Sequence, residues 1–255
     1  MANERLRSTL IERGYTTRDF ANEIGVDAKT VERWLTIGRT PHRETAYRAA
    51  RLLDVSAGWL WPTLQQAGAS TSRAEVVAFY PHRSQVPKNC WLELLSEASE
   101  KIYLLAYASL FLPEENPETI TLLRKKAANG TDIRIVLGDP KSPEVELRGL
   151  EEQLFEAIPA RVRMALAYYS PLLGVPGVQF HLHRTTLYNS VFRFDDQMLI
   201  NQHIYGTYGY VAPILHLRRV EGANLFDTYD KSFHRVWDMS YPFDGNLRPQ
   251  LSDSG

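Results

Sequence analysis

The chain has 255 residues, of which 44% are hydrophobic and 23% are charged, and its formal net charge at pH 7 is -1. This is the profile of a globular protein long enough for two domains, and the near-zero charge excludes a protein that coats nucleic acid along its whole length. Cys90 is the single cysteine. It excludes an intrachain disulfide and a four-cysteine zinc site and favours a reducing setting.

The sequence shows no signal for membrane insertion or export. No stretch approaches roughly 18 consecutive apolar residues, and the opening MANERLRSTL lacks the apolar segment of a signal peptide. We therefore expect a cytoplasmic protein with no membrane partner.

Apolar periodicity predicts an all-α head of five short helices in residues 1–64. Leu6 and Leu10 lie one helical turn apart, Asp27 is a favourable N-cap, and Gly25 and Gly38 are residues at which helices end. The expected helices cover about residues 3–13, 17–25, 28–38, 43–53 and the segment after Ser56. The small polar segment QQAGASTSRAE, residues 65–75, predicts a linker.

The segment TRDFANEIGVDAKTVERWL, residues 17–35, has the spacing of a helix-turn-helix motif. Two crossing helices need a small residue where they touch, then a glycine for a turn with positive φ, then a branched apolar residue that packs the second helix back. Ala21, Gly25 and Val31 meet this spacing. The alternative is a small helical bundle that serves only protein contacts.

With these residues the segment resembles the Cro/C1-type (XRE) family of helix-turn-helix regulators over about residues 3–64. The resemblance implies that the start of the third helix enters the major groove, where Lys29 and Arg33 would donate to guanine and Ala28 would touch a thymine methyl group. The implied DNA-binding residues are Thr17, Asp27, Ala28, Lys29, Glu32, Arg33, Arg39 and Arg43. Family members often carry glutamines at the reading positions, so the resemblance does not give the operator sequence.

From residue 76 the pattern changes to alternating strands and helices, which predicts an α/β domain with a mixed sheet over 76–244 and a flexible tail over 245–255. The run KIYLLAYASLF predicts a buried strand at 101–111, followed by a helix at 117–130 and a second strand at 131–140. This order is a βαβ unit with a parallel strand pair. The remaining elements are expected at 142–158 (helix), 177–183 (strand), 187–201 (hairpin), 211–219 (strand) and 224–237 (helix).

The element order, the phrase TDIRIVLGDP and the closing SFHRVWDMSYPF resemble the phospholipase D-like superfamily over about residues 76–244. The resemblance implies a catalytic phrase H-x-K-x4-D on a strand that leads into a turn. In that chemistry one His attacks phosphorus, a second His protonates the leaving group, Lys neutralises the phosphate, and Asp orients the His.

The hairpin LYNSVFRFDDQMLIN, residues 187–201, departs from that phrase. With Asp195 at the Asp position, Tyr188 replaces the His and Ser190 replaces the Lys. A tyrosine has an ordinary pKa near 10 and is a poor nucleophile at neutral pH, and the phosphate loses its counter-charge. We therefore predict no catalytic residue, no metal and no cofactor, with the question of enzymatic activity leaning towards none.

A pocket remains the expected feature of this region. The candidate ligand-binding residues are Tyr188, Ser190, Asp195, Asn201 and His203. The alternatives are a domain that only dimerises and a domain with residual catalysis.

Together these features predict a sequence-specific, nucleoid-associated transcriptional regulator. Its head would bind a double-stranded DNA operator, and its second domain would form a homodimer and sense a small-molecule effector. One alternative is a phosphodiesterase or nuclease targeted to DNA by the head, with His203 or His183 as the nucleophile. A second alternative is an antitoxin-like protein whose second domain holds a protein partner.

Overall fold

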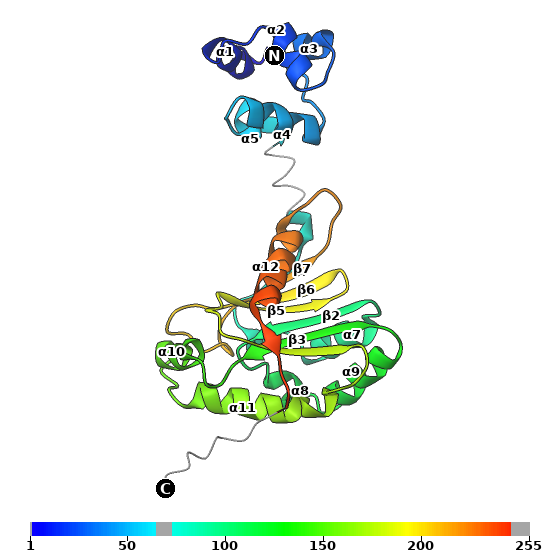
Figure 1. Cartoon of the computed structure of the whole chain (residues 1–255), viewed down its shortest axis with the longest axis vertical. Helices are drawn as coiled ribbons and strands as arrows, with labels where there is room; N and C mark the ends of the chain where they lie inside the picture. The colour runs from blue at the N-terminus through cyan, green and yellow to red at the C-terminus, as the bar shows by residue number, and fades with distance from the viewer. Residues whose placement is uncertain (1, 65–72, 246–255) are drawn as a thin grey trace. The chain divides into compact units, whose positions relative to one another are not determined.

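The computed structural model describes residues 2–64 and 73–245, and the chain divides into two compact units, Met1–Ala74 and Glu75–Gly255 (Figure 1). Residues 65–72 of the predicted linker and residues 246–255 of the predicted tail lie outside the described residues, whereas residues 73–75, which were predicted to belong to the linker, are helical. Glu75, however, already belongs to the second unit. It is buried, and its carboxylate accepts hydrogen bonds of 2.8 Å from the backbone N–H groups of Leu225 and Phe226 at the start of a helix.

The described part of the first unit is helical. Its helices are α1 (Glu4–Glu12), α2 (Thr17–Glu23), α3 (Ala28–Thr36), α4 (Arg43–Leu52) and α5 (Ala57–Leu60). The predicted apolar positions Leu6 and Leu10 are buried in one core. Trp34 and Trp61 meet edge to face in that core, with ring centroids 5.8 Å apart.

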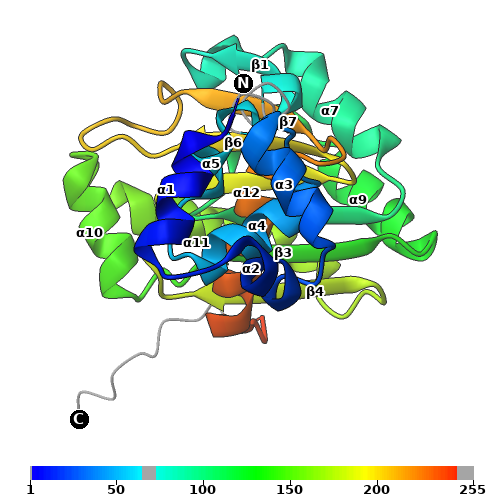
Figure 2. The same ribbon diagram turned by 90° about the horizontal axis from the view of Figure 1, so that it is seen from above.

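Helices α2 and α3, labelled in Figure 2, follow each other along the chain, are joined by residues 24–27 and pack together. Gly25 has a φ of 67°, so the turn has the positive φ that the motif requires. Ala21 is 1% exposed and Val31 is 0% exposed, and the two side chains pack in the core of the unit. Asp27 is the N-cap of α3 and accepts from the backbone N–H of Lys29 at 2.7 Å.

The second unit is built on a mixed eight-stranded sheet. The strands are β1 (Val76–Tyr80), β2 (Lys101–Ala106), β3 (Asp132–Gly138), β4 (Val178–His183), β5 (Asn189–Phe194), β6 (Gln197–Gln202), β7 (Ile214–Arg218) and β8 (Tyr241–Pro242). Their order across the sheet is β1-β7-β6-β5-β2-β3-β4-β8. The pairs β2–β3 and β3–β4 are parallel, so the predicted βαβ unit is confirmed, and the other pairs are antiparallel.

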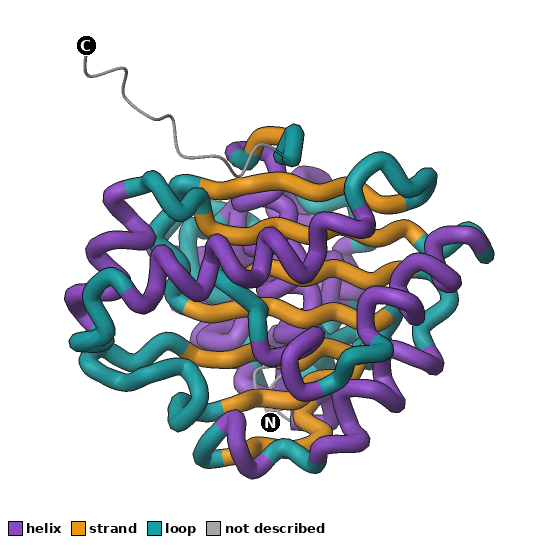
Figure 3. The backbone as a smooth tube through the Cα atoms, turned by 90° about the horizontal axis from the view of Figure 1, so that it is seen from below, coloured by secondary structure: helices purple, strands orange, loops and turns teal. Residues whose placement is uncertain are grey.

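Helices cover both faces of this sheet. They are α7 (Lys88–Glu97), α8 (Phe111–Glu115), α9 (Thr119–Ala128), α10 (Pro143–Glu151), α11 (Ala157–Tyr169) and α12 (Leu225–Met239), with short 3-10 turns η1 (Arg83–Gln85) and η2 (Ser170–Leu172). Helices α7, α9 and α11 lie on one face, in front of the strands in Figure 3, and α12 lies across the other. An aromatic cluster packs against one face of β5. Its rings, from Trp91, Phe111 and Phe192, meet edge to face with centroids 4.9–5.6 Å apart.

Two predicted elements end earlier than expected. The strand at 101–111 stops at Ala106, and residues 107–110 lead into α8. The helix at 142–158 is broken: Gln153 and Phe155 have positive φ, and the N–H of Phe155 donates to the carbonyl of Gly149. A Cβ at Gly149 would lie 2.2 Å from the carbonyl oxygen of Phe155, so the chain turns back over this glycine and begins α11, which the sequence pattern did not separate from α10.

Candidate functional site

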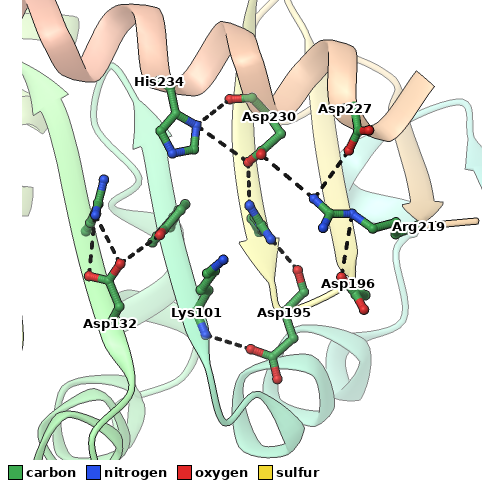
Figure 4. A network of polar contacts seen from close by, with 11 residues as sticks. Lys101, Asp132, Asp195, Asp196, Arg219, Asp227, Asp230 and His234 are labelled. Carbon is green, nitrogen blue, oxygen red and sulfur yellow. Dashed lines mark hydrogen bonds and ion pairs between the residues drawn. The ribbon is translucent and has the colours of Figure 1, made fainter. Parts of the chain in front are cut away.

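The hairpin β5–β6 turns at Asp195 and Asp196, as predicted, but its tip is a structural joint. The carboxylate of Asp195 accepts from the backbone N–H groups of Ser99, Glu100 and Lys101 at 2.8, 2.9 and 2.7 Å (Figure 4 labels Lys101). Burial raises the pKa of Asp195, but these donors outweigh burial and hold its pKa below the ordinary value. The carboxylate therefore fastens the hairpin tip to the start of β2.

A cavity of about 70 Å³ lies at the other end of β5, beside the carboxyl end of β2. Ser190, Asn201 and His203 line it, so the structure brings together three of the five predicted ligand-binding residues. Tyr188 is 80% exposed and is not part of the lining. Asp195 is held at the opposite end of the strand. The expectation that these two residues contribute to the pocket is therefore not met.

Ser190 and His203 form a hydrogen-bonded pair on the cavity wall. Ser190 Oγ lies 3.0 Å from His203 Nε2, and His203 Nδ1 lies 3.0 Å from the carbonyl oxygen of Leu187. A carbonyl can only accept, so Nδ1 carries the proton in the neutral ring and Nε2 accepts from the Ser190 hydroxyl. Burial, reinforced by the positive charge of Arg148, lowers the pKa of His203 to about 4, so the ring is neutral at pH 7.

Three arginines that the sequence reasoning missed line the same cavity. Arg83 comes from η1, Arg148 from α10 and Arg161 from α11, together with Glu152 just after α10. These positions are far apart in the sequence and follow no motif, so only the packing of α10 and α11 beside the sheet brings them to Ser190. The lining residues thus carry three positive charges and one negative charge.

Arg148 is the most deeply buried of the three, at 5% exposure. It forms ion pairs with Glu152 and, at 3.4 Å, with Glu151, and it donates weakly to the carbonyl of Thr207 at 3.4 Å. Its Nε atom is buried and has no hydrogen-bond partner in the described part of the chain. An unsatisfied buried donor costs roughly 1–3 kcal/mol.

Arg83 and Arg161 are less fully compensated. The guanidinium of Arg83 stacks over the Phe111 ring at 4.0 Å from its centroid, and among the described residues no carboxylate lies within ion-pair distance of it. Burial lowers the pKa of Arg83, which reports the desolvation of its charge. Arg161 has one partner, Glu114, at 3.9 Å. Arg83 is therefore the lining cation that has no acidic partner among the described residues.

A larger cavity of about 530 Å³ lies beyond the carboxyl ends of β3 and β4, against α11. Asp139, one of the two acidic residues of its lining, is satisfied: it accepts from Tyr241 at 2.7 Å, from Arg184 at 2.8 Å and from the backbone N–H of Lys141 at 2.9 Å. Arg163, another basic residue of its lining, is exposed. This cavity consequently lacks the buried, unsatisfied donors of the first one.

The predicted DNA-contacting residues lie on the surface of the first unit. Asp27, Lys29, Glu32, Arg33 and Arg39 are exposed. Thr17, Ala28 and Arg43 are partly buried. Within residues 2–64 no carboxylate forms an ion pair with Lys29, Arg33 or Arg39. Helix α3 therefore presents free cations to solvent, while the Asp27 carboxylate caps its own helix.

No helix among the described residues is long and apolar enough to span a bilayer. The described residues also hold no cluster of three or more His, Cys, Asp or Glu side chains arranged for a metal ion.

No protein-family model matches this sequence, and no curated protein matches it. Among solved structures, the chain is similar to TrmBL2, an archaeal chromatin protein described as showing a novel mode of DNA binding, with 11% identity and a TM-score of 0.42 over 86% of this chain and 72% of that one.

It is also similar to Nuc of Salmonella typhimurium, a phospholipase D family member, with 13% identity and a TM-score of 0.41 over 65% of this chain and 95% of that one. NucT of Helicobacter pylori gives 10% identity and a TM-score of 0.41 over 65% and 98% of the two chains. At these identities and TM-scores the likeness does not identify the function of this chain.

Proposed function

We propose that this protein is a sequence-specific DNA-binding transcriptional regulator whose second unit binds a small effector. The observation that carries the proposal is helix α3, which follows a Gly25 turn of positive φ and presents Lys29 and Arg33 without acidic partners among the described residues. A helix held in this way and bearing free cations suits the major groove of DNA.

The surface of the first unit supports distinct roles for its residues. Lys29 and Arg33 would donate to guanine O6 and N7, and Ala28 would meet a thymine methyl group. Thr17, Arg39 and Arg43 would contact phosphates, which position the helix without reading sequence. Asp27 is occupied as the cap of α3, so its negative charge is directed at backbone N–H groups rather than at DNA.

The test is fluorescence anisotropy of the full chain on its own upstream DNA over a salt series. We expect Arg33→Ala to cost about 1–3 kcal/mol of binding free energy and to relax sequence preference. The matched control is Arg7→Ala, because Arg7 is an exposed arginine of the same unit, on α1, that pairs with Glu4. The proposal fails if wild type does not prefer upstream DNA over random DNA, or if both variants lose affinity equally.

A homodimer belongs to the same proposal, because regulators that use this motif bind two half-sites through a two-fold dimer. Sedimentation velocity of the full chain, with and without upstream DNA, tests this point. If the protein sediments as a monomer and binds a single half-site, the proposed homodimer is wrong.

A phosphodiesterase is the second candidate, and the Ser190–His203 pair beside three arginines favours it. Ser190 Oγ would attack phosphorus and pass its proton to His203 Nε2, which would return the proton to the ester alcohol as its P–O bond breaks; water would then hydrolyse the phosphoserine diester. A base with a pKa of about 4 is poorly matched to proton abstraction at pH 7, which is why effector binding is the preferred function of this cavity. Hydrolysis of bis-p-nitrophenyl phosphate or plasmid DNA in EDTA, abolished by Ser190→Ala, would reverse that preference.

A further inference from the structure

We propose that the cavity beside Ser190 binds one compact dianion, either inorganic phosphate or the terminal phosphate of a phosphomonoester, and does not admit a phosphodiester. This inference rests on the proposed effector-binding role of the second unit and names the chemical class of the effector. It differs from the diester chemistry that the resembled phospholipase D-like superfamily implies.

The lining favours an anion. It contains Arg83, Arg148, Arg161 and one carboxylate, Glu152. Glu151 and Glu114 reach Arg148 and Arg161 from outside the lining, so Arg83 is the lining cation that has no ion pair among the described residues. Burial raises the pKa of Glu152, although Arg148 opposes that shift. An anion beside Arg83 would supply the acidic partner that this cation lacks among the described residues.

The cation without an ion pair shows where the anion would lie. Arg148 is 5% exposed and already pairs with Glu151 and Glu152. Arg83 is partly buried and carries no ion pair within the described part of the chain. Uncompensated buried charge is strongly destabilising unless a partner arrives, and guanidinium groups pair with phosphate through parallel hydrogen bonds.

The size of the cavity limits the ligand. A volume of about 70 Å³ corresponds to roughly five times the space that one water molecule needs, which fits one phosphate group with its five heavy atoms. A diester carries a second substituent on phosphorus, which would have to fit inside the same lining. A monoester directs its single substituent out through the open side.

Ser190 and His203 would adapt to the anion. Ser190 donates to neutral His203 in this structure, so the hydroxyl is not available as a donor. A dianion favours the imidazolium form of His203, whose Nε2–H then donates to Ser190 and frees the hydroxyl to donate to the anion. The groups that face His203 are Arg148 of α10, Arg83 of η1, His183 of β4 and Tyr107, which stacks on the ring after β2.

The test is calorimetric titration of the full chain, without DNA, with inorganic phosphate, phenyl phosphate and bis-p-nitrophenyl phosphate. We expect saturable binding of the first two probes and none of the diester, with Arg83→Gln weakening phosphate at least tenfold. Arg83 is the chosen position because the substitution breaks no ion pair among the described residues. Arg163→Gln is the matched control: Arg163 lies on α11 beside the larger cavity, and its loss should leave phosphate affinity unchanged.

Three results would overturn the inference: no phosphate binding by wild type, equal losses in the Arg83 and Arg163 variants, or diester binding as tight as that of phosphate. Equal losses would assign the anion to general surface charge or to the larger cavity. Because the titration contains no DNA and the DNA assay contains no phosphate ligand, failure of one leaves the other standing.

Discussion

The second unit contains two groups of arginines in opposite electrostatic situations. Beneath α12, Arg193 and Arg219 lie among Asp196, Asp227 and Asp230 (Figure 4 labels Arg219 and these acidic groups). Arg193 pairs with Asp230 and donates to the carbonyl of Asp195 at 2.9 Å, and Arg219 reaches all three carboxylates within 3.8 Å. Each cation in this network has an acidic partner in place.

The cavity beside Ser190 has the reverse balance. Its three arginines share one lining carboxylate, Glu152. Glu151 and Glu114 reach Arg148 and Arg161 from outside the lining, whereas Arg83 has no ion pair among the described residues. Ion pairs between buried arginines and carboxylates hold α12 against the sheet. A buried arginine without a carboxylate destabilises the fold until an anionic ligand pairs with it. The presence or absence of a carboxylate partner for each arginine, rather than the number of arginines, therefore distinguishes a structural network from a binding site.

The largest effect should come from breaking the compensated network. In Asp230→Ala, Arg193 would remain at 4% side-chain exposure without its carboxylate, so we expect a loss of about 3–5 kcal/mol of unfolding free energy. Urea unfolding followed by circular dichroism measures this loss. Asp227→Ala is the control, because Asp227 is half-exposed and its pair with Arg219 should contribute less than about 1 kcal/mol. Equal losses of unfolding free energy in the two variants would show that burial does not determine how much these ion pairs stabilise the fold.

The hairpin tip should rank second. Asp195→Asn removes the negative charge that accepts from the backbone of Ser99, Glu100 and Lys101 while keeping a residue type that tolerates its φ of 50°. We expect a loss of about 2 kcal/mol of unfolding free energy, since hydrogen bonds to a charged group are among the stronger ones.

Phosphate affinity should stay unchanged in Asp195→Asn, because Asp195 does not line the cavity. Asp196→Asn is the neighbouring control, with a side chain that is 71% exposed and an ion pair of 3.6 Å to Arg219. If Asp195→Asn changes phosphate affinity and Asp196→Asn does not, the hairpin tip influences the cavity at the other end of β5. That result would contradict the expectation that the two ends act independently.

Local residue patterns were sufficient to predict the helices of the first unit, the turn at Gly25 and the hairpin tip, because each depends on caps, glycines and alternation within a short segment. The cavity could be predicted only through Ser190, Asn201 and His203, which share one hairpin. Tertiary packing places Arg83 and Arg148 beside the cavity, and no local sequence pattern around either residue predicts this position. The same limit hid the break between α10 and α11, which depends on the close approach of Phe155 to Gly149.

A third effect, of intermediate size, should come from protonating the cavity. The pKa of His203 is about 4 in the folded chain against an ordinary value near 6.5, so the unfolded chain binds a proton first as the pH falls. The stability that neutral His203 contributes is complete above pH 6.5 and is lost as the pH falls towards 4. From pH 6.5 to 5.5 the expected loss is about 1 kcal/mol from this group.

Urea midpoints of wild type and His203→Gln over this pH range isolate the contribution of His203, since His183, whose pKa burial also lowers to about 4, titrates in both proteins. Saturating phosphate should flatten the wild-type curve, because the anion raises the pKa of His203 in the folded state. A wild-type curve that is parallel to that of the variant, with or without phosphate, would show that His203 does not titrate with folding.

The smallest effect on stability should come from the residue most important for the ligand. Arg83→Gln removes a desolvated charge that has no carboxylate partner among the described residues, so its loss costs the cation–π contacts with Phe111 and Tyr210. We expect a change within about 0.5 kcal/mol of unfolding free energy, measured as for Asp230→Ala, alongside the tenfold or greater loss of phosphate affinity. A large loss of unfolding free energy would show that Arg83, like Arg193, stabilises the fold rather than serving mainly to bind a ligand. Little loss of stability with a large loss of binding is the signature of an arginine whose partner comes from outside the chain.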